Sequence, residues 1–265
     1  MSAGDTPVAP PATKRPLRRW PWIVAGVVAT LVVVASAGFV VWATSTADPQ
    51  PVAIAALDSD ELVQVIEDDG FVFEPTAGAR LGFIFYPGGR VDPASYAAFA
   101  RQIAEAGYLV VVPQLRLNLA VFDANAATDI ITAHPLIEQW AIGGHSLGGS
   151  MAAQFAADNP GAVSGLSLWA AYPPDGTDLA SAELVVVSVF GTRDGLTSLD
   201  DIDDSRSRLP PSTEFVAIDG GNHAQFGDYG AQPGDNPATI SADAQRQQTV
   251  AATVQMLAQI DQGGR

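Results

Sequence analysis

A serine in this chain lies in a pattern that is typical of a nucleophile. Residues 144–148 read Gly-His-Ser-Leu-Gly, directly after an apolar run and at the start of an expected helix. Glycines on both sides of a serine allow a sharp turn, which holds the serine oxygen at the positive end of the helix. The amide of Leu147 then points to where an oxyanion would form. We therefore predict that Ser146 is a nucleophile for acyl transfer and Leu147 an oxyanion donor.

A serine hydroxyl attacks a carbonyl only when a base removes its proton. The chain has three histidines. His223 ends a Gly-Gly-Asn-His loop directly after the last expected strand, which is where an active-site base would be carried. His145 is beside the serine in the chain and should pack away from it, and His134, before a proline, should lie on the surface. We predict that His223 is the base; the alternative is an exposed loop histidine.

The base needs a carboxylate that holds its tautomer and stabilises the imidazolium. Asp194 lies in Gly-Thr-Arg-Asp-Gly, directly after another apolar run, and is our choice. The chain order Ser146, Asp194, His223 is the nucleophile–acid–base order of one class of fold. The alternative for Asp194 is a turn aspartate that stabilises its own loop. Asp219 and Asp228 are the reserve candidates for the acid.

A second main-chain amide should help to hold the oxyanion. Residues 86–90 read Tyr-Pro-Gly-Gly-Arg and end an expected strand. The two glycines permit a turn that offers free N–H groups. We predict that Gly89 supplies this amide, with Gly88 or Arg90 as alternatives. A plain strand-to-helix turn is the competing interpretation.

Apolar runs and helical stripes alternate along the chain and would position these residues. The expected strands are 62–67 and 71–74, joined as a hairpin, then 81–86, 108–112, 139–143, 163–169, 184–190 and 214–218. The expected helices are 93–106, 123–133, 147–158, 199–208 and one that Ser241 caps. Such alternation predicts an α/β fold, with a mostly parallel sheet and helices on both faces.

With these motifs, the sequence resembles the α/β-hydrolase fold family from about Leu62 to Ile260. The stretch FYPGGRVDP at 85–93, with GHSLGG and GNH, is similar to the bacterial branch near the dienelactone hydrolases. Those enzymes usually carry a cysteine nucleophile, whereas this chain has Ser146. The resemblance therefore implies a general carboxylesterase rather than a dienelactone hydrolase.

Many members of that family insert a helical lid after the strand that follows the nucleophile. Here only Ala170 to Glu183 separate two expected strands, which is too short for a lid domain. The resemblance therefore implies an open site. Trp169 and Tyr172 would lie near its mouth as substrate-binding residues.

Composition excludes several other kinds of chemistry. The 265 residues include 29 acidic side chains, 13 basic ones and no cysteine. Disulfides, thiolate catalysis and zinc–sulfur sites are thereby excluded. No spacing of histidines and carboxylates suggests another metal, and we expect no cofactor. The net charge of −16 argues against nucleic acid as a partner, because phosphate binding needs clustered Lys and Arg.

The charge also divides the chain. Residues 22–43 contain no charged side chain, 18 of the 22 are apolar, and tryptophans stand at both ends. As a helix this segment would span about 33 Å, enough for a bilayer core of about 30 Å. The next basic residue after this segment is Arg80. Four basic residues lie before it: Lys14, Arg15, Arg18 and Arg19. This asymmetry places the N-terminus in the cytoplasm and the rest outside.

We accordingly predict four parts: a cytoplasmic basic tail at 1–19, a transmembrane helix (signal anchor) at 22–43, a linker at 44–55, and an extracytoplasmic α/β-hydrolase domain at 56–262. The alternative for the apolar segment is a cleavable signal peptide, because small residues at 45–47 could form a cleavage site. The domain would then be secreted.

Together these features predict a serine hydrolase that cleaves a small-molecule or lipid-like carboxylic ester through an acyl-enzyme intermediate. Two alternatives remain. An extracytoplasmic acyltransferase would use the same three side chains with another hydroxyl in place of water. A non-catalytic binding protein would keep the fold without the reaction.

Overall fold

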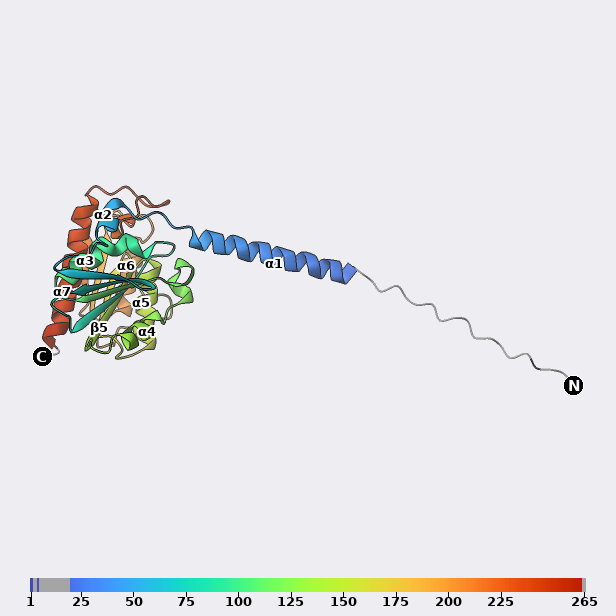
Figure 1. Cartoon of the computed structure of the whole chain (residues 1–265), viewed down its shortest axis with the longest axis horizontal. Helices are drawn as coiled ribbons and strands as arrows, with labels where there is room; N and C mark the ends of the chain where they lie inside the picture. The colour runs from blue at the N-terminus through green and yellow to red at the C-terminus, as the bar shows by residue number, and fades with distance from the viewer. Residues whose placement is uncertain (2–3, 5–19, 264–265) are drawn as a thin grey trace. The chain divides into compact units, whose positions relative to one another are not determined.

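The computed structural model describes residues 1, 4 and 20–263, and the chain divides into two units, Met1–Trp42 and Ala43–Arg265 (Figure 1). Most of the expected basic tail at 1–19 lies outside the described residues. Helix α1 (Trp20–Thr44) contains the segment Ile23–Thr44, whose mean hydropathy is 2.5. This helix is long and apolar enough for a membrane anchor or a signal sequence.

The second unit is built on one eight-stranded sheet in the order β1-β2-β4-β3-β5-β6-β7-β8. Its strands are β1 (Val63–Glu67), β2 (Gly70–Pro75), β3 (Leu81–Tyr86), β4 (Leu109–Pro113), β5 (Gln139–His145), β6 (Gly165–Trp169), β7 (Val185–Gly191) and β8 (Glu214–Ile218). Strand β2 pairs antiparallel with both neighbours, and all other pairs are parallel. The mostly parallel sheet and the first hairpin are therefore confirmed.

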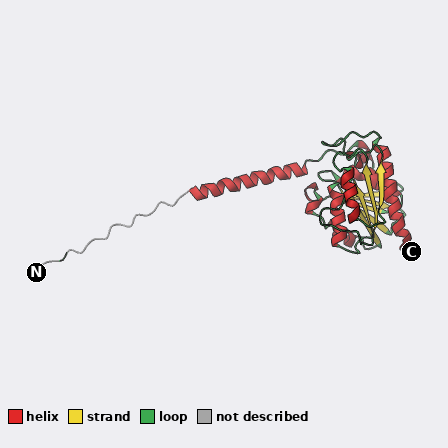
Figure 2. Ribbon diagram, turned by 180° about the vertical axis from the view of Figure 1, so that it is seen from behind, coloured by secondary structure: helices red, strands yellow, loops and turns green. Residues whose placement is uncertain are grey.

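Helices cover both faces of this sheet, as predicted. They are α2 (Pro51–Ala55), α3 (Ala97–Glu105), α4 (Ala126–Ala133), α5 (Leu147–Asp158), α6 (Leu199–Ser205) and α7 (Ala242–Gly263). Figure 2 shows the strands enclosed between helices. Helices α3 and α7 pack over one apolar cluster and α5 over the other. Every residue of β3 is buried, as its continuous apolar run predicts.

The expected linker at 44–55 is in contact with the domain that carries the sheet. Ala47 pairs with Val91 in a parallel bridge, and the Gln50 N–H donates to the Asp228 carbonyl over 2.7 Å. In α2, Ala53 is fully buried. The compact unit thus begins at Ala43, earlier than the expected boundary at 56.

The connection between β6 and β7 carries no lid. Residues 170–184, all of which the structure describes, contain no helix and no strand. The expectation that a lid domain is absent agrees with this. The connection after β6 therefore places no lid over the carboxyl ends of the strands, which is where ligands bind in open α/β sheets.

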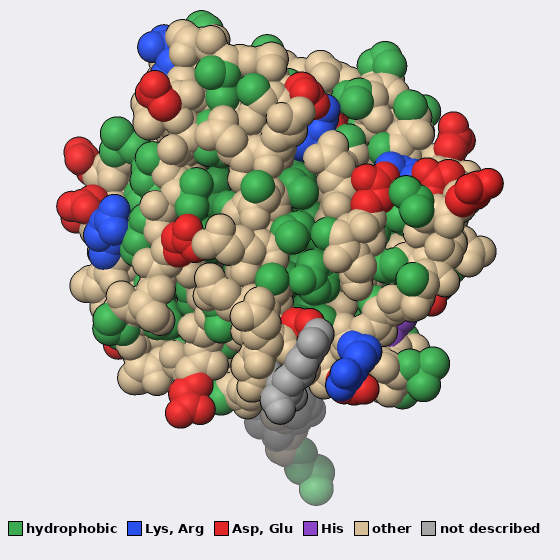
Figure 3. Space-filling view, turned by 90° about the vertical axis from the view of Figure 1, so that its left-hand side faces the viewer, with side chains coloured by type: hydrophobic (Ala, Val, Ile, Leu, Met, Phe, Trp, Pro, Cys, Tyr) green, Lys and Arg blue, Asp and Glu red, His purple; other side chains and the backbone are tan. Residues whose placement is uncertain are grey.

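Acidic side chains are spread over the surface of the domain. Figure 3 shows one face of the molecule with scattered acidic side chains and no gathered basic patch. This agrees with the charge of the sequence, in which 29 acidic residues stand against 13 basic ones. On this face nothing resembles the clustered cations that bind a phosphate backbone.

Candidate active site

Ser146 lies on a sharp turn between β5 and α5, as the sequence predicts. Its backbone angles are φ 52° and ψ −122°, a conformation that costs free energy for any residue other than glycine. The Ser146 N–H donates to the Trp169 carbonyl over 2.9 Å and fixes the turn to β6. Helix α5 begins at the next residue, so its N-terminus lies directly behind the serine.

The two glycines of the motif are required by close contacts between backbones. A Cβ atom on Gly148 would lie 2.2 Å from the Tyr86 carbonyl oxygen, and one on Gly144 would lie 2.5 Å from the carbonyl carbon of Gly148. Neither distance is compatible with a side chain, because the obstructing atoms are main-chain atoms. The spacing in the sequence therefore reflects the packing of α5 against the ends of β3 and β5.

Asp194 and His223 come together at the ends of β7 and β8. The two side chains are each 1% exposed, and His223 Nδ1 lies 2.8 Å from Asp194 Oδ2. The other carboxylate oxygen accepts the N–H groups of Leu196 and Thr197, over 2.8 and 2.7 Å. Asp194 thus stabilises its own loop and also contacts the histidine. The predicted contact with the base and the alternative role in a turn are therefore both present.

The pairing leaves the far nitrogen of His223 available. With Nδ1–H donated to the carboxylate, Nε2 carries the lone pair. Within the described part of the chain, this buried Nε2 has no hydrogen-bond partner. An unprotonated imidazole nitrogen that is held by a carboxylate on its other side can act as a general base.

The reserve carboxylates are engaged elsewhere. Asp228 pairs with the buried Arg246, whose Nη1 lies 3.0 Å from Oδ1. Burial raises the pKa of Asp228, and the charge of Arg246 opposes this shift. Asp219 is exposed and accepts the Thr192 hydroxyl over 3.2 Å. Asp194 is the carboxylate that contacts His223.

The loop after β3 leaves one amide free at the candidate oxyanion site. The Gly88 N–H donates to the Tyr96 hydroxyl over 2.9 Å, and the Arg90 N–H donates to the Asn118 carbonyl over 2.7 Å. The N–H of Gly89, between them, has no acceptor among the described residues. A Cβ on Gly89 would lie 3.2 Å from Leu147 Cδ2, so this loop adjoins the nucleophile turn. Of the three alternatives, the hydrogen bonding favours Gly89.

His145 links the nucleophile turn to the base. Its ring centroid lies 4.6 Å from that of His223, and its Nδ1 lies 2.9 Å from the Tyr96 hydroxyl. That hydroxyl accepts the Gly88 N–H, and it donates its own proton to His145 when Nδ1 is the unprotonated nitrogen of the ring. Burial, and secondarily the positive charge that His223 can carry, holds the pKa of His145 well below 6.5. The expected packing role is therefore accompanied by a hydrogen bond.

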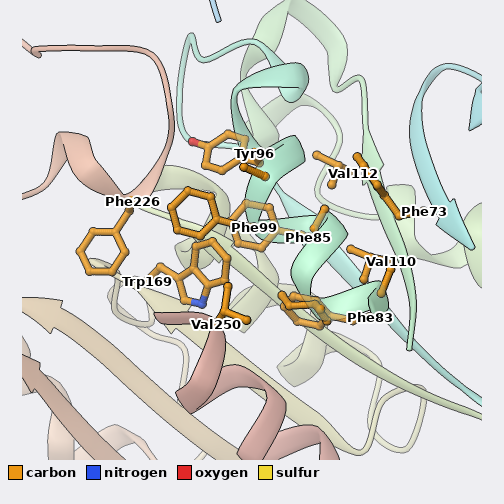
Figure 4. Packing of buried hydrophobic residues seen from close by; sticks show 14 of the residues in the cluster. Phe73, Phe83, Phe85, Tyr96, Phe99, Val110, Val112, Trp169, Phe226 and Val250 are labelled. Atoms are coloured by element: carbon orange, nitrogen blue, oxygen red, sulfur yellow. The ribbon is translucent and has the colours of Figure 1, made fainter. Parts of the chain in front are cut away.

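The two predicted substrate-binding residues, Trp169 and Tyr172, differ in how deeply they are buried. Trp169 is 1% exposed, and its indole N–H donates to the hydroxyls of Ser167 and Thr253. Figure 4 shows it within the aromatic cluster, beside Phe99. The expectation that Trp169 lines the mouth of the site is wrong, because its side chain faces the core under α7. Tyr172 is half-buried and remains a candidate.

A groove that is separate from these residues lies elsewhere on the domain. It has a volume of about 970 Å³ and runs along β2 and β4 beside α4, with Val72, Val111 and Ile130 in its lining. Neither Ser146 nor His223 lines it. Among the described residues, no group of three or more histidines and carboxylates is arranged to hold a metal ion.

Comparison with known proteins agrees with this architecture. The model of the alpha/beta hydrolase family matches residues 82–247, and the chain belongs to that family. A CIB-like hydrolase from Thermoplasma acidophilum shares the fold, with a TM-score of 0.54, 16% identity, and coverage of 74% of this chain and 96% of that one. Est1E from Butyrivibrio proteoclasticus gives a TM-score of 0.53, 12% identity, and coverage of 74% and 99%. No curated protein matches the sequence.

Proposed function

We propose that the protein is a serine hydrolase that cleaves carboxylic esters through an acyl-enzyme intermediate. The observation that carries the proposal is the contact of 2.8 Å between His223 Nδ1 and Asp194, with His223 Nε2 left without a partner among the described residues. Ser146 follows β5, and Asp194 and His223 follow β7 and β8, so all three belong to the same edge of the parallel sheet. Membership of a hydrolase family supports the same function.

The first half of the reaction forms the acyl-enzyme. His223 Nε2 takes the proton of Ser146 Oγ as that oxygen attacks the ester carbonyl, and Asp194 stabilises the imidazolium. The N–H groups of Leu147 and Gly89 hold the negative oxygen of the tetrahedral intermediate. The intermediate then expels the alcohol, which takes the proton from His223. The second half repeats these steps with water as the nucleophile and releases the acid.

The substrate class follows from the open site and the apolar helix. Without a lid, the carboxyl edge of the sheet can receive a small or lipid-like ester from solvent or from a surface. As a signal anchor, α1 would hold the domain outside the cell membrane with the N-terminus in the cytoplasm. If the segment is cleaved as a signal peptide, the same domain would act as a secreted enzyme.

The test is hydrolysis of short p-nitrophenyl esters by the full chain in detergent. Ser146→Ala should lower kcat/KM by about 10⁴-fold or more, because the nucleophile is lost. Ser164→Ala is the matched control, because Ser164 is a half-buried serine that does not lie on a strand-to-helix turn. This variant should retain the parent rate. Covalent labelling by a fluorophosphonate should likewise require Ser146.

Two results would overturn the proposal. Ser146→Ala could hydrolyse esters as fast as the parent, or the parent could fail to react with the fluorophosphonate, which would favour a non-catalytic binding protein. Added alcohols separate hydrolysis from acyl transfer. A transferase would form the new ester in preference to the free acid.

A further inference from the structure

Asp235 joins the loop of the candidate acid to the loop of the candidate base. Its Oδ1 accepts the Gly195 N–H over 2.9 Å, and its Oδ2 accepts the Ala224 N–H over 2.8 Å. Gly195 directly follows Asp194, and Ala224 directly follows His223. One carboxylate therefore bridges the two residues that come next in the chain after the acid and the base.

We propose that Asp235 is a positioning residue that fixes the distance between Asp194 and His223. The inference rests on the proposed function of those two side chains. It concerns a carboxylate outside the predicted set of Ser146, Asp194 and His223. The Asp235 carboxylate accepts no hydrogen bond from Ser146 or from His223 and acts through two main-chain amides.

The segment that carries Asp235 is itself tied to both loops. The Asn222 side-chain amide donates to the Asn236 carbonyl over 2.8 Å, and Arg193 Nε donates to the Pro237 carbonyl over 2.7 Å. Gly195 also approaches closely, since a Cβ there would lie 2.7 Å from the Asn236 nitrogen. The carboxylate is thus held on a fixed segment and can act as a rigid spacer.

A carboxylate suits this position and an amide does not. All three partners of Asp235 are N–H donors: Gly195 and the neighbouring Asn236 meet Oδ1, and Ala224 meets Oδ2. An ionised carboxylate accepts on both oxygens, whereas an asparagine has one acceptor oxygen and an NH₂ group that would face one of the donors. Replacing the aspartate by asparagine therefore removes one of the two bridging hydrogen bonds. It also places the side-chain NH₂ group against a main-chain N–H, while the size of the side chain is nearly unchanged.

The consequence for the reaction is geometric. The hydrogen bond between His223 and Asp194 holds the imidazole in the tautomer that leaves Nε2 unprotonated. If the two loops separate, this bond lengthens and the base is misplaced. A misplacement of about 1 Å can lower a rate by about 100-fold.

The experiment compares Asp235→Asn with Asp178→Asn in the full chain in detergent. Asp178 is the matched control, because its carboxylate also accepts a main-chain N–H, that of Ala180 over 2.9 Å, but only within its own exposed turn. Asp235→Asn should lower kcat for p-nitrophenyl acetate by about 10- to 100-fold with KM nearly unchanged. Asp178→Asn should match the parent.

A second measurement separates positioning from a general loss of structure. The proton on His223 Nδ1, detected by NMR in protein with ¹⁵N-labelled histidine, should be strongly downfield in the parent because of its bond to Asp194. It should move upfield or exchange away in Asp235→Asn while thermal unfolding still begins above the assay temperature. Should that variant not fold, Asp235→Glu, which keeps two acceptor oxygens, should keep the downfield proton.

The outcomes are distinct from those that test the proposed function. The inference is overturned if folded Asp235→Asn keeps both the parent kcat and the parent Nδ1 resonance, or if Asp235→Glu folds and loses that resonance. If the parent itself hydrolyses no ester, the proposed function fails, and the resonance still tells whether Asp235 sets the contact between Asp194 and His223.

Discussion

The candidate nucleophile and the candidate acid–base pair are held by two different kinds of structure. The turn at Ser146 is local: β5, the serine and α5 follow one another, and the glycines at 144 and 148 permit the close backbone contacts. Asp194 and His223 are 29 positions apart and meet through hydrogen bonds among three loops. A local turn can be read from a short motif, whereas an assembly of loops depends on contacts that are distant in the chain.

The largest effect is expected where the acid–base assembly is broken directly. In Asp194→Asn, the side-chain oxygen can still accept the N–H groups of Leu196 and Thr197. The amide nitrogen then faces His223 Nδ1 and forces the wrong tautomer. We expect kcat to fall by about 10⁴-fold in a protein that remains folded. Steady-state kinetics together with circular dichroism will measure this.

The reserve carboxylate supplies the control for that prediction. Asp228→Asn removes the buried one of the two carboxylates that pair with Arg246 and leaves only the exposed Asp243. This should destabilise the domain by about 3 kcal/mol in urea unfolding. The kcat of the folded fraction should stay near that of the parent. If Asp228→Asn abolishes turnover and Asp194→Asn does not, the acid has been assigned to the wrong residue.

A smaller effect is expected from the hydrogen bond that fixes the loop after β3. Tyr96→Phe leaves the Gly88 N–H and His145 Nδ1, both buried, without the hydroxyl that joins them. Each unsatisfied group should cost about 1–3 kcal/mol of stability. Because the neighbouring Gly89 amide is no longer held in place, kcat should also fall by about tenfold. Kinetics and thermal unfolding test both effects.

Tyr86→Phe is the matched variant. The Tyr86 hydroxyl also accepts a main-chain N–H, that of Ala127 over 2.8 Å, and donates to the Ala124 carbonyl, at the end of the domain near α4. Its loss should cost similar stability with an unchanged kcat. Equal losses of kcat in the two variants would mean that Tyr96 acts on the reaction only through overall stability.

Sequence patterns identified the elements and the local turn well, and the long-range contacts poorly. The alternation of apolar runs and helical stripes predicted the strands to within a few residues, because buried parallel strands are continuously apolar. The glycine spacing around Ser146 predicted the position of the turn to the exact residue. The choice of Asp194 over two other aspartates rested on its place after a strand, and its contact with His223 required the structure.

Three residues show why the long-range contacts could not be predicted from the sequence. Tyr96 falls on the apolar stripe of the expected helix 93–106 and is fully buried, so its pattern indicates core. Its hydroxyl nevertheless accepts the Gly88 N–H in the candidate oxyanion loop. Asp235 lies in Pro-Gly-Asp-Asn-Pro, which reads as a turn, and one of its partners is 40 positions away. Trp169 ends strand β6 at the carboxyl edge of the sheet, as expected. Its side chain, however, lies on the face of the sheet that α7 covers. Side-chain direction and distant partners are not encoded in local spacing.

The smallest effect concerns His145, where the two regions meet. Burial holds the pKa of folded His145 well below 6.5, so only the unfolded chain takes up a proton as the pH falls below about that value. The contribution of the neutral buried ring is therefore present above pH 6.5 and is lost as the pH falls toward the pKa of the folded state. It should steepen the loss of unfolding free energy by up to about 1.4 kcal/mol per pH unit.

His145→Gln isolates that contribution. Glutamine keeps an oxygen that can accept the Tyr96 hydroxyl, but it cannot take up a proton. Between pH 7 and pH 5, urea unfolding of this variant should therefore show a smaller loss of stability than the parent, although the variant starts less stable because its packing against His223 is poorer. Parallel curves for the two proteins would mean that His145 is protonated equally in the folded and unfolded states. The buried ring would then not have to stay neutral to keep the nucleophile turn beside the base.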